Sequence, residues 1–146
     1  MSYQEYFENV KEGSYHLNSL QASSISSMLE DLADEAERST ATILAANAED
    51  LARMPESDPK YDRLKLTTSR IAAIADDIRK VAKLPNPLGK VLLKKALENG
   101  LELEKRTVAL GVIGIIYEAR PNVTFDVFAL SAKSGNACVL KGGSDA

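Results

Sequence analysis

A run of six residues, VIGIIY at positions 112–117, is the feature that most constrains the fold of this chain. It is apolar throughout and rich in β-branched residues, a pattern typical of strands covered on both faces of a parallel sheet. Residues 125–133 follow with helical spacing of their apolar side chains, and a second short apolar run occupies residues 138–140 after Gly135 and Asn136. Strand, helix and strand in this order predict a βαβ unit with a right-handed crossover.

The first 84 residues have the spacing of amphipathic helices. Residues 29–36 carry apolar side chains at helical intervals, and the serine pair at 23 and 24 is expected to cap this helix. Residues 43–51 repeat the pattern, with Asn47 on the apolar side. The strongest stripe covers residues 71–82, begins at Thr67 or Thr68, and ends before the prolines at 85 and 87.

Between the helices and the βαβ unit the sequence predicts a β-hairpin. Asn99 and Gly100 separate residues 91–97 from residues 101–110, and this pair favours a two-residue turn because both residues tolerate positive φ. In the second arm leucine alternates with glutamate over residues 101–104, which predicts a half-buried strand. We therefore expect a helical region (1–88), a hairpin (89–110) and the start of an α/β domain (111–146).

Composition excludes several classes of function. The chain has 146 residues, 45% of them apolar and 27% charged, with one cysteine and one histidine, so neither an internal disulfide nor a histidine-rich metal site is expected. No stretch is long and apolar enough to span a membrane, and Glu5 and Glu8 stand where a signal peptide would carry basic residues. The default expectation is a cytoplasmic protein that does not bind a membrane.

Charge is unevenly distributed along the chain. Residues 1–62 have a net charge of −9, and residues 63–146 have a net charge of +6. Two solvated faces of opposite sign would explain this, and so would an anionic ligand, such as a phosphate-bearing molecule, bound by the second half. The basic residues are scattered with no aromatic platform among them, which argues against nucleic acid.

The carboxyl ends of the two predicted parallel strands are where a ligand of an α/β sheet would bind. Residues 118–124 follow the first strand and residues 141–145 the second; together they offer acids, cations, an amide, hydroxyls and two glycines, a set that suits a phosphorylated ligand. Gly111 and Gly114 lie before or within the first strand, so the dinucleotide fingerprint GxGxxG is missing and an ordinary Rossmann dehydrogenase is disfavoured.

At these residues the sequence resembles a known family. The run LGVIGIIYEARPNVTFDVFALSAKSGNACVLKGG, residues 110–143, is similar to the gamma-glutamyl phosphate reductase family of the aldehyde dehydrogenase superfamily, and the segments upstream to about Ser23 resemble it as well. The resemblance implies an aldehyde dehydrogenase-like α/β fold, with a helical region, a hairpin used for subunit pairing and the first βαβ unit of an incomplete Rossmann-like domain. It also implies NADPH-dependent reduction of L-glutamyl 5-phosphate to L-glutamate 5-semialdehyde and phosphate, in proline synthesis.

The resemblance assigns roles to residues after the first strand. Asn122 matches the asparagine whose amide helps to form the oxyanion hole of aldehyde dehydrogenases; alternatively it caps or shapes the start of the following helix. Arg120, beside Glu118, is a candidate contact for the anionic substrate, and we treat both as candidate substrate-binding residues. The alternative is that Arg120 forms a structural ion pair with Glu118 or another acid.

Two further residues follow the second strand. Lys141 matches the lysine that contacts the adenosine ribose, and Ser144 stands where many NAD-preferring relatives carry a glutamate. Without that carboxylate a 2′-phosphate is not repelled, so NADP(H) is the expected cofactor. The alternative for Lys141 is a solvated lysine at a strand end.

The nucleophilic cysteine of the family has no counterpart among these residues. Cys138 lies inside an apolar strand, where a thiol is an inert small hydrophobe. We therefore expect an amino-terminal fragment that is inactive by itself and forms homo-oligomers, because the first parallel strand has at most one partner here and exposed edges associate. Two alternatives remain, another member of the aldehyde dehydrogenase superfamily and a non-catalytic assembly module.

Overall fold

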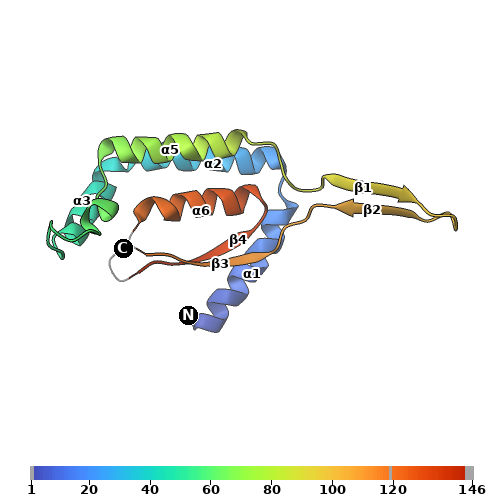
Figure 1. Ribbon diagram of the computed structural model, residues 1–146, viewed down its shortest axis with the longest axis horizontal. Helices are drawn as coiled ribbons and strands as arrows, with labels where there is room; N and C mark the ends of the chain where they lie inside the picture. The colour runs from blue at the N-terminus through green and yellow to red at the C-terminus, as the bar shows by residue number, and fades with distance from the viewer. Residues whose placement is uncertain (1, 119, 144–146) are drawn as a thin grey trace.

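The computed structural model of the chain describes residues 2–118 and 120–143. Figure 1 shows a body of helices around a small sheet, from which one hairpin projects. In chain order the elements are α1 (Tyr3–Ser19), α2 (Ala22–Arg38), α3 (Thr40–Leu51), α4 (Tyr61–Leu64), α5 (Thr68–Lys83), β1 (Val91–Ala96), β2 (Glu102–Arg106), β3 (Val112–Ile116), α6 (Pro121–Lys133) and β4 (Ala137–Lys141). β1 and β2 pair antiparallel, and β3 and β4 pair in parallel through α6, so the predicted hairpin and βαβ unit are confirmed.

The core lies where α2, α5 and α6 meet. α2 and α5 run side by side, and α6 lies between this pair and the β3–β4 sheet (Figure 1). The buried core residues are Ile25, Leu29, Ala33, Ile74, Ala75, Ile78, Ala82, Ala129 and Ala132. The predicted stripe of α5 is therefore confirmed, and its cap is Thr67, whose side chain accepts a hydrogen bond from the Arg70 amide.

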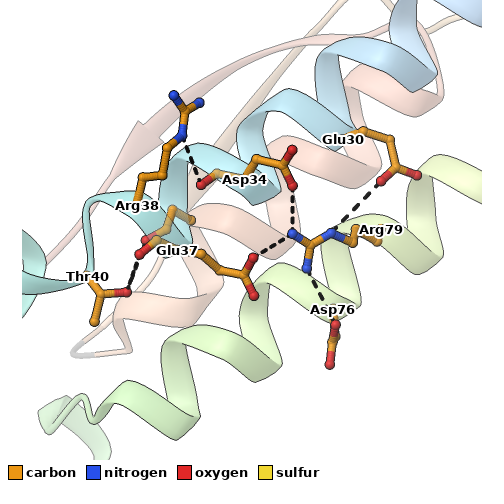
Figure 2. Close-up of polar contacts among 8 residues, drawn as sticks. Glu30, Asp34, Glu37, Arg38, Thr40, Asp76 and Arg79 are labelled. Atoms are coloured by element: carbon orange, nitrogen blue, oxygen red, sulfur yellow. Dashed lines mark hydrogen bonds and ion pairs between the residues drawn. The ribbon is translucent and has the colours of Figure 1, made fainter.

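A cluster of charges ties the solvent edges of α2 and α5 together. Arg79 of α5 reaches Asp34 at 2.7 Å and Glu37 at 2.6 Å on α2, with Glu30 and Asp76 at 4.0 and 3.5 Å (Figure 2). The hydrogen bond from Arg79 lowers the pKa of Glu37. The cluster joins the solvent edges of the two helices whose apolar faces form the core.

A lysine at the end of α6 is buried among uncharged acceptors. The Nζ of Lys133 donates to the backbone oxygen of Ala82 at 2.7 Å and to the hydroxyl of Ser26 at 2.8 Å. The lysine thus satisfies a carbonyl in the last turn of α5, where a cation is favoured by the helix dipole. One side chain thereby joins α6 to both helices of the pair.

Gly135 lies just after the carboxyl end of α6, close to side chains from two other segments. Its φ is +71°, and a Cβ there would stand 2.5 Å from Cδ1 of Leu88 and 2.9 Å from Oδ1 of Asn18. The stop predicted at Gly135 and Asn136 is confirmed, and the positive φ of this turn favours glycine.

Asn47 sits on the buried side of α3 as a polar residue in an apolar position. Its Nδ2 donates to the backbone oxygen of Leu64 at 2.9 Å, and its Oδ1 accepts from the backbone amide of Leu66 at 2.7 Å. Asn47 therefore holds the bend between α4 and α5, which lines the cavity described below.

Two predictions of local structure are wrong. The serines at 23 and 24 do not cap α2, because its apolar face extends back to Ile25 and the helix begins after Gln21. The hairpin turn has three residues, 98–100, in which Gly100 alone has positive φ (+86°). Asn99 instead accepts a hydrogen bond from the amide of Leu101, an Asx turn that keeps its own φ negative.

The predicted burial of the strands is wrong as well. All residues of β1 and β2 are exposed, including the leucines expected on a buried face, because the hairpin projects away from the helical body (Figure 1). β3 alternates between exposed and partly buried residues, and Ile116 is 86% exposed. Within the described residues β3 pairs only with β4, so one edge of β3 has no neighbouring strand, and its residues are not buried on both faces as the apolar run predicts.

Candidate active site

The parallel register brings the two predicted loops to one edge of the sheet. Ile116 at the end of β3 is paired with Lys141 at the end of β4, and the amide of Tyr117 donates to the backbone oxygen of Lys141 at 3.1 Å. The loops then stay in contact, since a Cβ on Gly143 would stand 3.7 Å from the Cα of Glu118. The strand ends therefore meet, as the βαβ pattern predicts.

Asn122 lies in the first turn of α6. Arg120 is the N-cap with an extended backbone and no side-chain cap, and Pro121 is the first helical residue. The side chain of Asn122 does not cap the helix; its Nδ2 donates to Oδ2 of Asp126 at 3.2 Å. The amide therefore projects at a helix N-terminus, where backbone N–H groups and the helix dipole favour negative charge.

Arg120 and Glu118 do not form the ion pair that the sequence leaves open. The carboxylate of Glu118 instead lies 3.8 Å from Nζ of Lys60, and only a backbone hydrogen bond, from the Arg120 amide to the Glu118 oxygen at 2.7 Å, joins the two residues. In the part of the chain that the structure describes, the guanidinium of Arg120 has no salt bridge. Its charge is therefore available to a ligand.

A cavity of about 380 Å³ lies between the α4–α5 bend and the start of α6. It brings Arg120 and Asn122 together with residues that sequence reasoning did not select. Its lining residues are Asp62, Arg63, Lys65, Leu66, Arg70, Ala73, Ile74, Asp77, Arg120, Pro121, Asn122 and Asp126. Four of these are basic and three acidic, so the cavity presents charges of both signs to a small polar molecule.

Not all of the cations in this cavity are free to meet a ligand. Arg70 is held by Asp62 at 3.1 Å and also donates to backbone oxygens of Asp62 and Lys65. It stabilises the bend and places Lys65 and its neighbour Arg63 on the cavity wall. Arg63, Lys65 and Arg120 are therefore the cations through which this cavity can bind an anion.

The acid beside Asn122 is partly shielded from water. Burial is the main cause that raises the pKa of Asp126, the charge of Asp77 raises it further, and the hydrogen bond from Asn122 lowers it. The spacing of four residues on one helix face is the signal that could have selected Asp126 once Asn122 was chosen. No pattern in the sequence connects α6 to the bend at residues 62–66, so those residues were missed.

Lys141 ends β4, and its Nζ donates to the backbone oxygen of Gly142 at 2.8 Å. The side chain is exposed at the same sheet edge as Glu118. Ser144, the other candidate cofactor residue, lies outside the described residues. An exposed ammonium at this edge fits a phosphorylated or ribose-bearing group, whose oxygens it can meet as a point charge.

The remaining reactive residue is Cys138, in the middle of β4. Burial raises the pKa of its thiol, and a hydrogen bond with Ser131 opposes that effect only in part. Within residues 2–118 and 120–143 no cluster of three histidine, cysteine or acidic residues could hold a metal ion. No helix in this described part is long and apolar enough to cross a membrane.

Comparison with solved structures identifies the class of fold. The chain superposes on a Saccharomyces cerevisiae structure with a TM-score of 0.91 at 33% identity, covering 99% of this chain and 38% of that one. A Thermotoga maritima structure gives 0.92 at 33% identity, covering 97% and 35%. The arrangement of hairpin, βαβ unit and helices is thus the aldehyde dehydrogenase-like fold.

Both structures are of gamma-glutamyl phosphate reductase, and the curated relatives carry the same name. The protein of Chlorobium phaeobacteroides is 62% identical over 139 residues, which are 95% of this chain and 33% of the relative. That of Bacteroides thetaiotaomicron is 55% identical over 140 residues, or 96% and 34%. No family model matches. The chain is homologous to gamma-glutamyl phosphate reductase and spans about one third of the length of these relatives.

Proposed function

We propose that this chain is part of a cytoplasmic NADPH-dependent enzyme that reduces L-glutamyl 5-phosphate to L-glutamate 5-semialdehyde and phosphate. The observation that carries the proposal is the 62% identity to a gamma-glutamyl phosphate reductase together with the position of Asn122 on the cavity wall. In the proposed reaction a thiolate attacks the acyl carbon, phosphate leaves, and the thioester is reduced to the aldehyde. In this proposal Cys138 is not the nucleophile, because it lies inside β4 and burial raises the pKa of its thiol.

In this proposal Asn122 stabilises the oxyanion that develops at the acyl carbon. An uncharged amide donor at a helix N-terminus is suited to this role, because it meets negative charge without itself titrating. Arg120 contacts the anionic substrate from the same cavity, and Glu118, whose carboxylate lies 3.8 Å from Nζ of Lys60, is the second candidate substrate-binding residue. Lys141 and Ser144 would hold the ribose and 2′-phosphate of NADPH, which supplies the hydride.

The test uses a full-length reductase that contains this chain, assayed by phosphate-dependent reduction of NADP with glutamate semialdehyde. Replacing one oxyanion donor lowers kcat by about 10²–10³, so the kcat of Asn122→Ala is expected to fall by that factor. Gln4→Ala, which changes an exposed amide on α1, is the matched control and should keep full activity. No activity in the parent protein would overturn the assignment and favour the assembly module.

The proposed substrate and cofactor contacts have separate readouts. Arg120→Ala should raise the KM for the acyl phosphate or semialdehyde, whereas replacing Arg53, an exposed arginine that does not line the cavity, with alanine should not. Ser144→Glu places a carboxylate against the 2′-phosphate and should lower kcat/KM for NADPH relative to NADH by at least about tenfold, the worth of one charged contact. An unchanged preference would remove Ser144 from the cofactor site.

We also propose that the protein is a homo-oligomer assembled through β1 and β2. Val91, Leu92 and Leu93 on one arm and Leu101 and Leu103 on the other are 47–61% exposed, a surface that a two-stranded ribbon cannot bury by itself. Leu93→Glu should dissociate the assembly in light scattering, whereas the surface change Glu49→Gln should not. A monomer of the unchanged protein would contradict this proposal.

A further inference from the structure

Asp126 is the residue that touches the proposed oxyanion donor. It stands four positions after Asn122 on α6, and its Oδ2 accepts a hydrogen bond from Nδ2 of Asn122 at 3.2 Å. Both side chains line the cavity at the start of the helix. The contact involves the same nitrogen that donates to the oxyanion in the proposed function.

A carboxylate restricts the orientation of the amide that it contacts. The carboxamide of Asn122 has two N–H donors and one oxygen acceptor, whereas an ionised carboxylate only accepts. Asp126 can therefore bind the NH₂ end and not the oxygen, which excludes the rotamer with the amide reversed. One N–H points to Asp126, and the second remains available to a ligand in the cavity.

The backbone under this pair is well fixed. Pro121 occupies the first position of α6, and the amide of Val123 donates to the backbone oxygen of Arg120 at 3.1 Å. Tyr117, directly after β3, hydrogen-bonds through its hydroxyl to Thr124. The start of the helix is thus tied to the end of the strand, so the remaining freedom of Asn122 is rotation of its side chain.

We propose that Asp126 is a positioning residue, which holds the Asn122 carboxamide with one N–H directed at the developing oxyanion. The inference rests on the proposed function and adds to it a residue that acts through Asn122 rather than on the substrate. Pre-organised donors stabilise a transition state because they need no reorientation when charge develops. Loss of Asp126 lowers kcat by freeing the amide to rotate, and it leaves the KM unchanged.

The alternative is an ordinary helix-surface pair of the i, i+4 type, whose only effect is on stability. The chain offers a matched example, since Nε2 of Gln4 donates to Oε1 of Glu8 at 3.1 Å on α1. Both contacts are exposed to solvent, but Glu8 is an exposed residue whereas Asp126 is partly buried, and burial raises the pKa of Asp126. Asn122 and Asp126 also both line the cavity at the start of α6, whereas neither Gln4 nor Glu8 does.

The test compares Asp126→Ala, Asp126→Ser, Asp126→Asn, Asn122→Ala and the double variant Asn122→Ala/Asp126→Ala in a full-length reductase that contains this chain. Loss of a hydrogen bond to a charged group corresponds to about tenfold to a hundredfold in kcat, with the KM within about twofold. Asp126→Asn keeps an acceptor oxygen and should restore kcat to within about threefold. Asp126→Ser is too short to reach Asn122 and gives a second deletion if the alanine variant fails to fold. Glu8→Ala is the matched control and should keep kcat.

The double variant separates positioning from an independent role. If Asp126 acts through Asn122, the double variant is no slower than Asn122→Ala alone. Three results would overturn the positioning role and leave the proposed function intact. The first is a double variant whose loss of kcat is the product of the two single losses, and the second is an Asp126→Ala variant in which only the KM rises. The third is full kcat in Asp126→Ala when Asn122→Ala has lost its activity. Full kcat in Asn122→Ala overturns the oxyanion role of Asn122, and the role of Asp126 with it.

Discussion

Replacing Asn47 with leucine tests whether one buried amide maintains the bend that lines the cavity. The change preserves approximate volume on the buried face of α3 but removes both the donor to the Leu64 oxygen and the acceptor of the Leu66 amide. Each hydrogen bond contributes a net 0.5–1.5 kcal/mol, and Leu64 is only 1% exposed, so its carbonyl cannot find water. We expect the bend to lose about 2 kcal/mol.

The exchange rate of the Leu66 amide hydrogen measures this loss of stability at the bend. A loss of about 2 kcal/mol corresponds to about 30-fold faster exchange, because each 1.4 kcal/mol is a factor of ten. Glu49→Gln, an exposed change on the same helix, should leave exchange at Leu66 unaltered. Equal protection of Leu66 in Asn47→Leu and in the parent chain would refute the role given to these two hydrogen bonds.

Three further outcomes follow from the packing and the charges. Gly135→Ala should destabilise the fold by about 1–2 kcal/mol in urea unfolding because of the positive φ, whereas Gly13→Ala, with nothing within 4 Å, should be neutral or stabilising. Cys138 should react with iodoacetamide more slowly than a free thiol at pH 8, since its pKa is raised; equal rates would contradict burial. Because the pKa of Glu37 is lowered in the folded state, its pairing stabilises the protein above the ordinary glutamate pKa and is lost on acidification. The fall in Tm between pH 6 and pH 3 should therefore be smaller in Arg79→Gln, and an unchanged fall would argue against the pairing.

Local patterns predicted the elements of the fold well where one physical signal dominates. The stripe of α5, its threonine cap and its proline stop were all confirmed, because apolar periodicity and capping act within a few residues. The start of α2 was missed because core packing of Ile25 extends the helix past the serine pair. Asn47 looked like part of an apolar face because only the folded chain shows the two backbone groups that it satisfies.

The part of the candidate site that follows the two parallel strands was predictable from the sequence, and the part that comes from the α4–α5 bend was not. Parallel strands place their carboxyl ends together, so the amino-acid sequence alone could assign Arg120 and Lys141 to one sheet edge. Arg63 and Lys65 reach the cavity from a bend stabilised by α3, a contact between segments far apart in sequence that no periodicity encodes. The exposure of β1, β2 and β3 was likewise unpredictable, since the sequence pattern of an apolar strand is the same whether or not another element packs against it.

Because the chain is synthesised from its amino terminus, the core can form only after α6 has been made. It packs residues 25–33 of α2 against residues 129–132 of α6, about 100 positions later. During synthesis α2 and α5 leave the ribosome before α6 exists, so the helical pair first forms with the face that α6 later covers still open. The nascent chain therefore passes through a stage with an exposed apolar face, at which it is most vulnerable to aggregation and most recognisable to chaperones.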